Sequence, residues 1–425
     1  MKKTPHTQDI VLWVGADWAD EKHCFFARKP DGSPGQLHWL EAKPKKLDEF
    51  FLKLHHEYPG GKIGVVLEKT RGPLVYNLLK HPFVRLYPIN PRCLSDFRGT
   101  LKASGAKSDP LDCELACELG YKHGERLRPF EVGDGLTRQL MLLTEQRRDL
   151  VDHQTAFSNQ LTAALKSYYP LAVELFSDNI CGTLCQDFLR RWPTLADVKK
   201  AKPQVLRSFF YAHRCRSEER IVQRLEAVAQ ASALTEDPAL ISVMQLQALS
   251  LCGCLQGVQK AIEAYEKRIA EVFATHAKAS VFASFPAAGP AMAPRLAAAF
   301  GTLEDNFPTP SHLQCLSGVA PVQKQSGKTK VVLFRWARPI FLHQTFVEYA
   351  RLSVQKSAWA NLLAEQLKEK GWSAFRIYRF LAFKWIRIMW RCWKDGTTYD
   401  EIRYLKALQK RGVARYQSLY VNEAK

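Results

Sequence analysis

The sequence predicts an α/β domain at the N-terminus, followed by a mostly helical chain. Strand-like and helix-like stretches alternate up to about residue 125, and strand signals fade from Leu136 onward. A chain of 425 residues is also too long for one ordinary core. We therefore expect two or three domains, of which the first contains a sheet.

The first domain reads as β-β-β-α-β-α-β-α. Three short strands joined by turns open it, as in a β-meander, and apolar residues at helical spacing or in short buried runs define the later elements. The expected strands are 10–15, 23–27, 36–40, 62–67 and 84–89, and the expected helices are 47–56, 73–79 and 109–121. This order predicts a mixed sheet with helices packed against it.

The rest of the chain reads as helices of very different lengths. The long ones suggest a coiled coil or helical hairpin, although their heptads are imperfect. A Pro/Gly-rich break at 285–290 lies between two short helices, where small residues permit close approach of the backbone to a phosphate. The expected helices are 136–168, shorter ones over 170–202, 217–229, 241–276, 293–300, 312–319 and more helix to 393, with a loop at 323–328.

The composition favours a polyanionic partner. Lys and Arg number 61 against 42 Asp and Glu, a net charge of +19, while 46% hydrophobic and 24% charged residues exclude a mostly disordered chain. The most apolar stretch, 377–393, carries four Arg or Lys residues, each costly at a bilayer centre. Because nothing suggests export, we expect a cytoplasmic protein without a membrane partner.

Cysteine usage supports that compartment. The eleven cysteines are scattered and lack the paired spacing of a zinc site, so we expect reduced and mostly buried thiols. Residues 371–415 hold 11 Lys and Arg against 3 Asp and Glu, with four tryptophans between them. Such a stretch suits phosphate contact with base stacking, but buried tryptophans explain the rings equally well.

Four carboxylates are candidates for a metal site. Asp17 and Glu68 stand at the ends of expected strands, and Asp109 and Asp112 lie at i and i+3 at a helix start, on one face. Hard oxygen ligands close together suit Mg²⁺, and two such ions stabilise the attacking and leaving oxygens in phosphodiester cleavage. Taken singly, Asp17 and Glu68 are also ordinary strand-end charges, and Asp109 before Pro110 resembles a helix N-cap.

This layout resembles the ribonuclease-H-like fold of nucleases, resolvases and many transposases. Three segments are similar to motifs of the DEDD transposases of bacterial insertion sequences, whose first domain resembles a RuvC-type resolvase. They are GADWADEKH at 15–23, VLEKTRG at 66–72 and KSDPLDCELA at 107–116, the last departing from the family at Ser108 and Cys113.

Two C-terminal segments extend the resemblance. FPAAGPAMAPRLAAAFG from residue 285 resembles the family's helix-hairpin-helix segment, and LSGVAPVQKQSGK at 316–328 resembles its Ser-Gly block. The resemblance implies that Asp17, Glu68, Asp109 and Asp112 hold Mg²⁺ and that Ser326 of a C-terminal transposase domain attacks DNA as a covalent nucleophile. Serine needs such help, because its hydroxyl is a poor nucleophile until a metal or base eases deprotonation.

The resemblance also implies a bacterial, nucleoid-associated location, together with partners and an assembly. A non-coding bridge RNA pairs with donor and target DNA, so base pairing selects the sequence. The protein is expected to form a dimer of dimers in which one subunit's acids meet another's serine. Residues expected to bind nucleic acid surround the serine: Lys324, Lys328, Lys330, Arg335 and Arg338. The two arginines stand where the family often has a glycine-containing basic block, and solvated surface charges are their alternative.

The expected domains are a RuvC-like domain at 8–130, a helical and coiled-coil region at 131–280, a transposase domain at 281–395 and a basic tail at 396–425. Two other functions stay open at this point. One is a hydrolytic nuclease or Holliday-junction resolvase, in which water attacks and Ser326 is an ordinary turn residue. The other is a non-catalytic nucleic-acid-binding protein.

Overall fold

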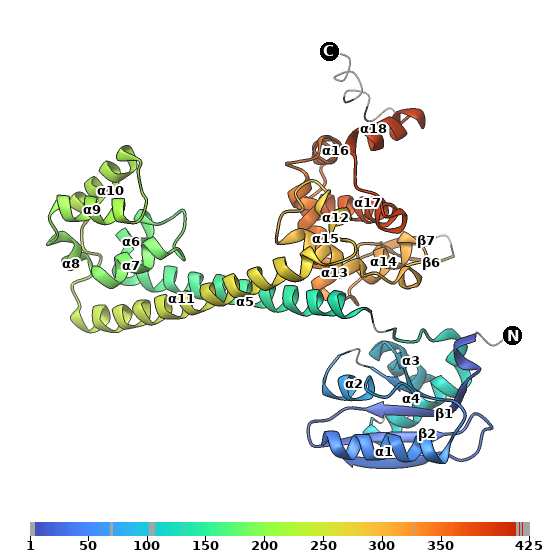
Figure 1. The fold of residues 1–425 in the computed structure, drawn as a ribbon. Coiled ribbons are helices and arrows are strands. Elements are labelled where there is room, and N and C mark those ends of the chain that lie inside the picture. Colours follow the sequence, from blue (N-terminus) through green and yellow to red (C-terminus); the bar gives the residue numbers. More distant parts are fainter. Residues whose placement is uncertain are drawn as a thin grey trace. The chain divides into compact units, whose positions relative to one another are not determined.

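The computed structural model describes residues 5–68, 71–101, 107–131, 133–327, 329–413, 416 and 419. They fall into two compact units, Met1–Val132 and Gly133–Lys425 (Figure 1). The first is mixed α/β and the second mostly helical, which confirms the predicted classes. Parts of the expected segments 66–72 and 396–425 lie outside the described residues, namely Lys69, Thr70 and most positions after 413.

A five-stranded sheet forms the centre of the first unit. Its strand order is β3-β2-β1-β4-β5, with β1, β2 and β3 antiparallel and β1, β4 and β5 parallel. The strands are β1 (Ile10–Asp17), β2 (Lys22–Arg28), β3 (Gln36–Glu41), β4 (Lys62–Leu67) and β5 (Val84–Pro88). All five expected strands are therefore confirmed, with ends shifted by at most two residues.

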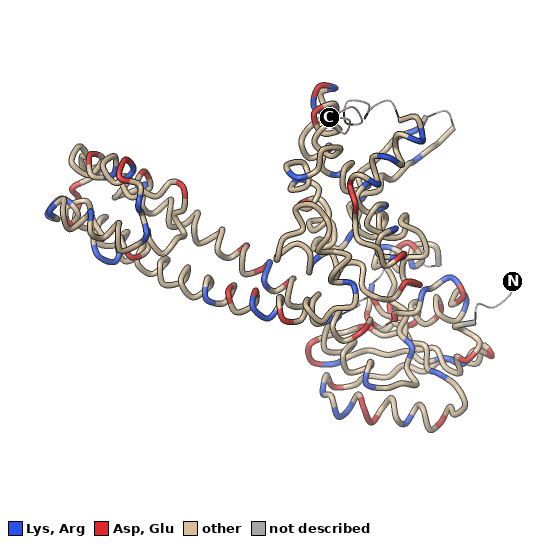
Figure 2. The backbone as a smooth tube through the Cα atoms, turned by 45° about the horizontal axis from the view of Figure 1, so that its top comes forward, with Lys and Arg blue, Asp and Glu red and all other residues tan. Residues whose placement is uncertain are grey.

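Helices cover both faces of this sheet. The helices are α1 (Pro44–Glu57), α2 (Pro73–Leu78), α3 (Pro91–Leu101) and α4 (Asp109–His123), with short 3-10 turns at Pro5–Thr7 and Gly124–Arg126. On one face Leu12 and Val14 pack with α1 and α2; on the other Trp13 and Val66 pack with α3 and α4. Because side chains alternate along a strand, burying both faces requires the apolar run seen in β1. Basic and acidic residues alternate along the exposed side of α1 (Figure 2).

Glycines bring α4 close to the sheet. A Cβ on Gly15 of β1 would lie 1.9 Å from the backbone oxygen of Cys113 in α4. Gly64 and Gly120 leave the space that the Trp13 ring fills, since a Cβ on either would approach the ring within 2.7 Å. Only glycine permits this approach, so the sequence fixes where α4 lies on β1.

Two long helices, α5 and α11, pair antiparallel in the second unit. The start of α5 packs with the end of α11 through Leu140 and Ile269, and the end of α5 packs with the middle of α11 through Leu165 and Leu255. By length and composition alone α11 could cross a membrane. Its buried face, however, is occupied by α5 along the pair.

Smaller helices pack at both ends of this pair (Figure 1). At one end, α6 to α10 form a cluster around Phe188 and Phe210, with acidic and basic residues interspersed over it (Figure 2). The helices of the long pair and of this cluster are α5 (Gly135–Tyr168), α6 (Pro170–Leu175), α7 (Thr183–Arg191), α8 (Leu195–Lys199), α9 (Pro203–Ala212), α10 (Glu218–Gln230) and α11 (Pro238–Ala274).

The remaining elements contain the largest core among the described residues, to which an exposed hairpin does not contribute. They are α12 (Ala279–Ala283), α13 (Met292–Phe300), a 3-10 turn (Glu304–Asn306), α14 (Pro310–Leu316), β6 (Val322–Ser326), β7 (Thr329–Leu333), α15 (Ile340–Ser353), α16 (Ala358–Glu369), α17 (Ala374–Asp395) and α18 (Glu401–Lys410). Trp385 and Trp393 of α17 are fully buried, so these two rings are core residues. The expected tail contains α18, whose Leu405 packs into the same core.

Two expectations from the sequence are wrong. Residues 323–328 are not a loop, because 322–326 and 329–333 pair as an antiparallel hairpin. The thiols are all unpaired, but only five of the eleven are fully buried: Cys24, Cys113, Cys117, Cys185 and Cys252. Exposed Cys93, Cys254 and Cys315 lie on helices that present that face to solvent.

Candidate active site

Two of the candidate acids lie side by side at one edge of the sheet. β1 and β4 are parallel neighbours, and Ala16 pairs with Leu67. Asp17 follows Ala16 as the last residue of β1, and Glu68 follows Leu67, the last residue of β4. The two acids therefore lie next to each other at the C-terminal ends of neighbouring strands. They line one cavity of about 200 Å³, whose wall also includes Trp18, Arg71 and residues 72–75.

The other two acids come from the first turn of α4. Ser108, not Asp109, is the N-cap residue, and no side-chain capping bond forms there, so capping does not explain Asp109. The close contact at Gly15 holds α4 against β1, and the Cys113 thiol donates to the Cys24 backbone oxygen at 3.1 Å. Asp112 is thereby held near the sheet and is only 7% exposed.

The charges at this edge oppose one another. Burial, followed by the nearby Asp109 carboxylate, raises the pKa of Asp17 above its ordinary value. Burial and then Asp17 and Asp112 raise the pKa of Glu68. Asp17 thus feels both acids of α4 and Glu68 feels Asp17 and Asp112, a repulsion that a bound cation would relieve.

The positive charges of Lys107 and Arg98 already lie near this cluster. Arg98 of α3 places Nη2 2.5 Å from Oδ1 of Asp112. The contact lacks hydrogen-bond geometry, and both Asp112 Oδ1 and Arg98 Nε are buried without a hydrogen-bond partner. Arg98 was not predicted from the sequence, because α3 was not expected and an ion pair between distant positions leaves no local signal.

The residues fit a magnesium ion by their donor chemistry. No three His, Cys, Asp or Glu side chains lie close enough to enclose a metal ion in the part of the chain described. Mg²⁺ does not need an enclosing cage, since it keeps several waters and binds through one or two carboxylates and substrate phosphate. The carboxylates of Asp17 and Glu68 on adjacent strands supply such oxygen donors, and those of Asp109 and Asp112 lie within electrostatic range of Asp17.

The candidate nucleophile lies at the tip of the hairpin in the second unit. Ser326 is exposed, ends β6 and pairs with Thr329 across a two-residue turn, where Gly327 has φ +55°. That backbone conformation favours glycine and is typical of hairpin turns. Among described residues, no side chain bonds the Ser326 hydroxyl.

The two described candidate lysines, Lys324 and Lys330, lie on opposite faces of the hairpin. Side chains alternate along a strand, so Lys324 shares the hairpin face of Ser326, whereas Lys330, paired with Gln325, points to the other face. Lys328 lies outside the described residues.

The candidate arginines follow β7. Arg338 Nη1 donates to the backbone oxygen of Arg335 at 2.7 Å, and the Arg338 guanidinium lies 4.3 Å from the Phe334 ring centroid. Within the described residues neither Arg335 nor Arg338 pairs with a carboxylate.

Comparisons with known proteins find relatives for both units of the chain. A DEDD transposase profile of the IS110 type, described as a transposase, matches residues 14–170, and the profile "Transposase IS116/IS110/IS902 family" matches residues 279–364. The mini-circle transposase assigned to IS117 of Streptomyces coelicolor is 25% identical over 407 residues, 93% of this chain and 96% of that protein. A protein of insertion element IS110 from the same organism is 24% identical, covering 76% of this chain and 78% of that protein.

The two matched profiles contain the two halves of the candidate site. The first spans Asp17, Glu68, Asp109 and Asp112, and the second spans Ser326. With both profiles matched in order and a relative aligned along nearly the whole chain, the protein belongs to the IS110/IS116/IS902 family of transposases, enzymes that cleave and rejoin DNA.

Proposed function

We propose that the protein moves its own insertion sequence by cleaving and rejoining donor and target DNA, with a covalent phosphoserine intermediate on Ser326. The observation that carries this proposal is the placement of Asp17 and Glu68 at the ends of adjacent parallel strands, with Asp109 and Asp112 near enough to raise the pKa of Asp17. Bound there, Mg²⁺ supplies charge stabilisation for the phosphate and for the attacking and leaving oxygens.

We propose a ribonuclease-H-like, RuvC-like fold for residues 8–130. The strand order 3-2-1-4-5, with three antiparallel strands followed by two parallel ones, supports it. Acids at the ends of β1 and β4 and on the helix crossing them support it further. The other proposed regions are 131–280, 281–395 and 396–425.

Ser326 has the position that a nucleophile needs. Its hydroxyl is exposed at a turn, with Lys324 on the same hairpin face to attract a phosphate. In the proposed step the serine Oγ forms a bond to phosphorus as the bond to the leaving sugar oxygen breaks, and the hydroxyl proton goes to a base. No histidine bonds the hydroxyl among described residues, so the acidic edge is proposed to assist.

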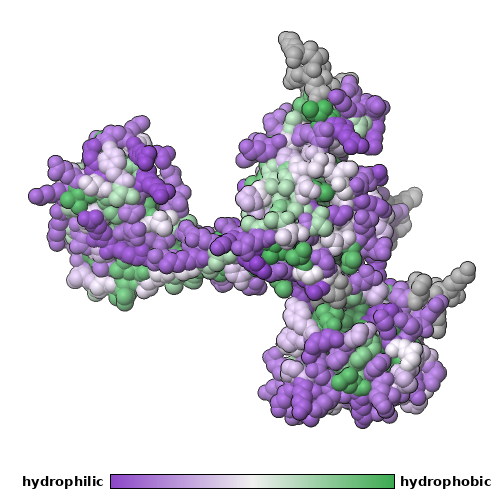
Figure 3. Space-filling model, in the orientation of Figure 1, coloured by the Kyte–Doolittle hydropathy of each residue, from purple (hydrophilic) through white to green (hydrophobic). Residues whose placement is uncertain are grey.

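A guide RNA and a tetramer complete the proposal. A net charge of +19 suits a protein that holds RNA and two duplexes, although DNA alone accounts for it equally. For the dimer of dimers, the support is hydrophobic surface over the first part of α11 (Figure 3), where Val243 and Leu246 are exposed. Such an assembly would let one subunit's acids work with another's serine.

The decisive experiment follows the covalent bond. The purified protein, with RNA from the sequence flanking its gene, is incubated with labelled element-end DNA and Mg²⁺, then resolved on a denaturing gel. A protein–DNA adduct that disappears in Ser326→Ala, while DNA and RNA binding persist, supports the proposal. Free 5′-phosphate ends formed equally by Ser326→Ala would instead identify a hydrolytic nuclease.

A further inference from the structure

Three arginines and an exposed tryptophan gather at the base of the hairpin. We call Phe334, Arg335, Trp336, Arg338, His343 and Arg379 the arginine–aromatic cluster. Phe334 lies at its centre, with the guanidinium of Arg338 4.3 Å and that of Arg379 4.9 Å from its ring centroid. Among described residues, none of the three arginines forms an ion pair.

Three polar atoms of this cluster lack a hydrogen-bond partner, although other atoms of the same side chains have one. His343 is only 8% exposed; its Nδ1 lies 3.0 Å from the Ser317 backbone oxygen, and its Nε2 has no partner. The Nε atoms of Arg335 and Arg338 are likewise buried without a hydrogen bond. Such groups usually find partners in a folded protein, so their lack of one here indicates that a ligand completes the site.

The charge of the cluster specifies an anion. Two guanidiniums share one ring without a neutralising carboxylate, and burial together with Arg376 and Arg338 lowers the pKa of Arg379. A guanidinium is also a planar fork that binds phosphate through two hydrogen bonds. A phosphate fits this charge and this geometry.

The exposed aromatic rings of the cluster indicate what is attached to the phosphate. Trp336 is 81% exposed, with its ring in edge contact with Phe334 at 4.9 Å, and Phe375 beside Phe334 is 52% exposed. Large aromatic rings held in water next to phosphate-binding cations are the usual platform for unpaired bases. In a duplex the base faces are stacked and cannot reach such rings.

The backbone around the cluster is built to hold it. Gly318, at φ +71°, leaves room for the Arg338 side chain, because a Cβ there would lie 2.1 Å from the Arg338 Cδ. The preceding residue, Ser317, supplies the carbonyl that His343 contacts. The Ser317–Gly318 turn thus positions two members of the cluster.

We propose that the arginine–aromatic cluster binds an unpaired nucleotide, with its phosphate on Arg338 and Arg379 and its base on Trp336. The cluster directly follows Leu333, the last residue of β7, whereas Ser326 lies at the other end of the hairpin. Four residue steps along the strand span about 13 Å, or about four stacked nucleotides. A strand held at the cluster therefore reaches the serine, which deepens and rests on the proposed function.

Trp336→Ala is the main test, because a side chain so exposed can be removed without disturbing the core. Binding of the intact protein to fluorescent single-stranded DNA, single-stranded RNA and duplex DNA of about 12 nucleotides is measured by anisotropy. We expect single-strand affinity to fall about tenfold or more, while duplex affinity changes less than about twofold. Loss with only one of the two single strands identifies DNA or RNA as the source.

Arg379→Gln tests the phosphate contact. It should reduce the slope of log affinity against log salt for single strands by about 0.7, the value for one phosphate contact. Arg268→Gln is the matched control, because Arg268 is an exposed arginine on α11 paired with Glu271, and it should leave the slope unchanged. Trp336 fluorescence, identified by difference from Trp336→Phe, should be quenched by the single strand.

Two outcomes would overturn this inference. One is wild-type single-strand affinity in both Trp336→Ala and Arg379→Gln. The other is a change in sedimentation of Trp336→Ala with unchanged nucleotide affinity, which would make the surface a contact between copies of the chain. Ser326→Ala separates the two proposals, because it should keep single-strand affinity even if no covalent adduct is ever found.

Discussion

The carboxylates of Asp17 and Glu68 repel neighbouring carboxylates at the C-terminal ends of β1 and β4. A carboxyl group whose pKa is raised in the folded protein weakens the fold at neutral pH, and that penalty disappears as the pH falls through the raised pKa. Asp17 and Glu68 both have raised pKa values, since burial and neighbouring carboxylates disfavour their charged forms. Binding of a cation and protonation therefore relieve the same strain.

This gives a prediction for Asp17→Asn. The change should raise the melting temperature of the protein in EDTA, because it removes one of the repelling charges, and it should abolish DNA cleavage. Mg²⁺ should raise the melting temperature of the wild type and do so less as the pH is lowered toward the raised pKa values, but should have little effect on Asp17→Asn. Scanning calorimetry with and without Mg²⁺ measures both; a stabilisation of Asp17→Asn by Mg²⁺ equal to that of the wild type would contradict the proposed metal site.

A second residue-scale prediction concerns the glycine that seats α4. Gly15→Ala should destabilise the protein by about 3 kcal/mol or more, because the new methyl group would overlap the Cys113 backbone oxygen and push α4 from β1. Gly99→Ala is the control, since Gly99 in α3 has open space around it and alanine should stabilise the helix by about 1 kcal/mol. Urea unfolding compares the two. Equal effects would show that α4 does not depend on this contact.

At the scale of elements, the sequence predicted most of the fold because the spacing of its apolar residues distinguished strands from helices. All five strands of the sheet and both long helices follow directly from apolar runs and spacing. The hairpin at 322–333 was missed because its strands are exposed on both faces and so carry no alternation. Its turn did leave a signal in Ser326-Gly327, but the strand pairing around it did not.

The candidate site was less predictable from the sequence than the fold was. Asp17 and Glu68 could be placed together because parallel strands end at one edge, and α4 could be placed only as a helix start. Arg335 and Arg338 were also candidates from the sequence, whereas Arg98 and Arg379 could not be found, since they depend on contacts between distant elements. Periodicity assigns elements, whereas tertiary packing decides which charges meet.

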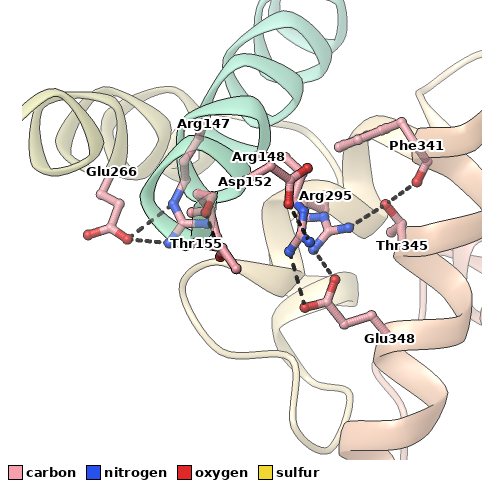
Figure 4. Close-up of polar contacts among 10 residues, drawn as sticks. Arg147, Arg148, Asp152, Thr155, Glu266, Arg295, Phe341, Thr345 and Glu348 are labelled. Atoms are coloured by element: carbon pink, nitrogen blue, oxygen red, sulfur yellow. Dashed lines mark hydrogen bonds and ion pairs between the residues drawn. The ribbon is translucent and has the colours of Figure 1, made fainter. Parts of the chain in front are cut away.

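Charged residues also join α5, α13 and α15 in the second unit. Arg295 of α13, whose side chain is 6% exposed, donates to Glu348 at 2.8 Å and to Thr345 at 3.1 Å (Figure 4). Arg148 of α5 approaches the same Glu348 at 3.9 Å, and neighbouring Arg147 pairs with Glu266 of α11. One carboxylate thus balances a buried cation between three helices.

Glu348→Ala should therefore cost about 3 kcal/mol of unfolding free energy, because it leaves the buried Arg295 charge unpaired. Replacing both partners, with Arg295→Met and Glu348→Leu, should cost much less, since no charge then remains buried. Glu271→Ala, at the exposed pair with Arg268, should cost under about 1 kcal/mol and serves as the control. Chemical denaturation of these three variants and the wild type measures the losses. Equal losses for the single Glu348→Ala and the double variant would show that the pair does not matter.

At the scale of the whole molecule, the acids and the serine belong to different compact units. Asp17, Glu68, Asp109 and Asp112 lie in the first unit, and Ser326 lies in the second. Catalysis by both therefore requires the two units to meet, either within one subunit or between subunits of the proposed tetramer. A symmetric assembly makes the second arrangement testable, because its interfaces repeat in every pair of subunits.

Mixing two inactive variants distinguishes these arrangements. Asp17→Asn keeps the serine and Ser326→Ala keeps the acids, so neither should form an adduct alone. If the site is shared between subunits, random mixing in equal amounts restores about a quarter of the sites, because half the pairs are mixed and each mixed pair has one intact combination. If each subunit uses its own residues, mixing restores none. Adduct yield on a denaturing gel measures the outcome. As a control, Asp17→Asn mixed with a chain that carries both Asp17→Asn and Ser326→Ala should stay inactive in either arrangement, because no subunit then has an intact acid set.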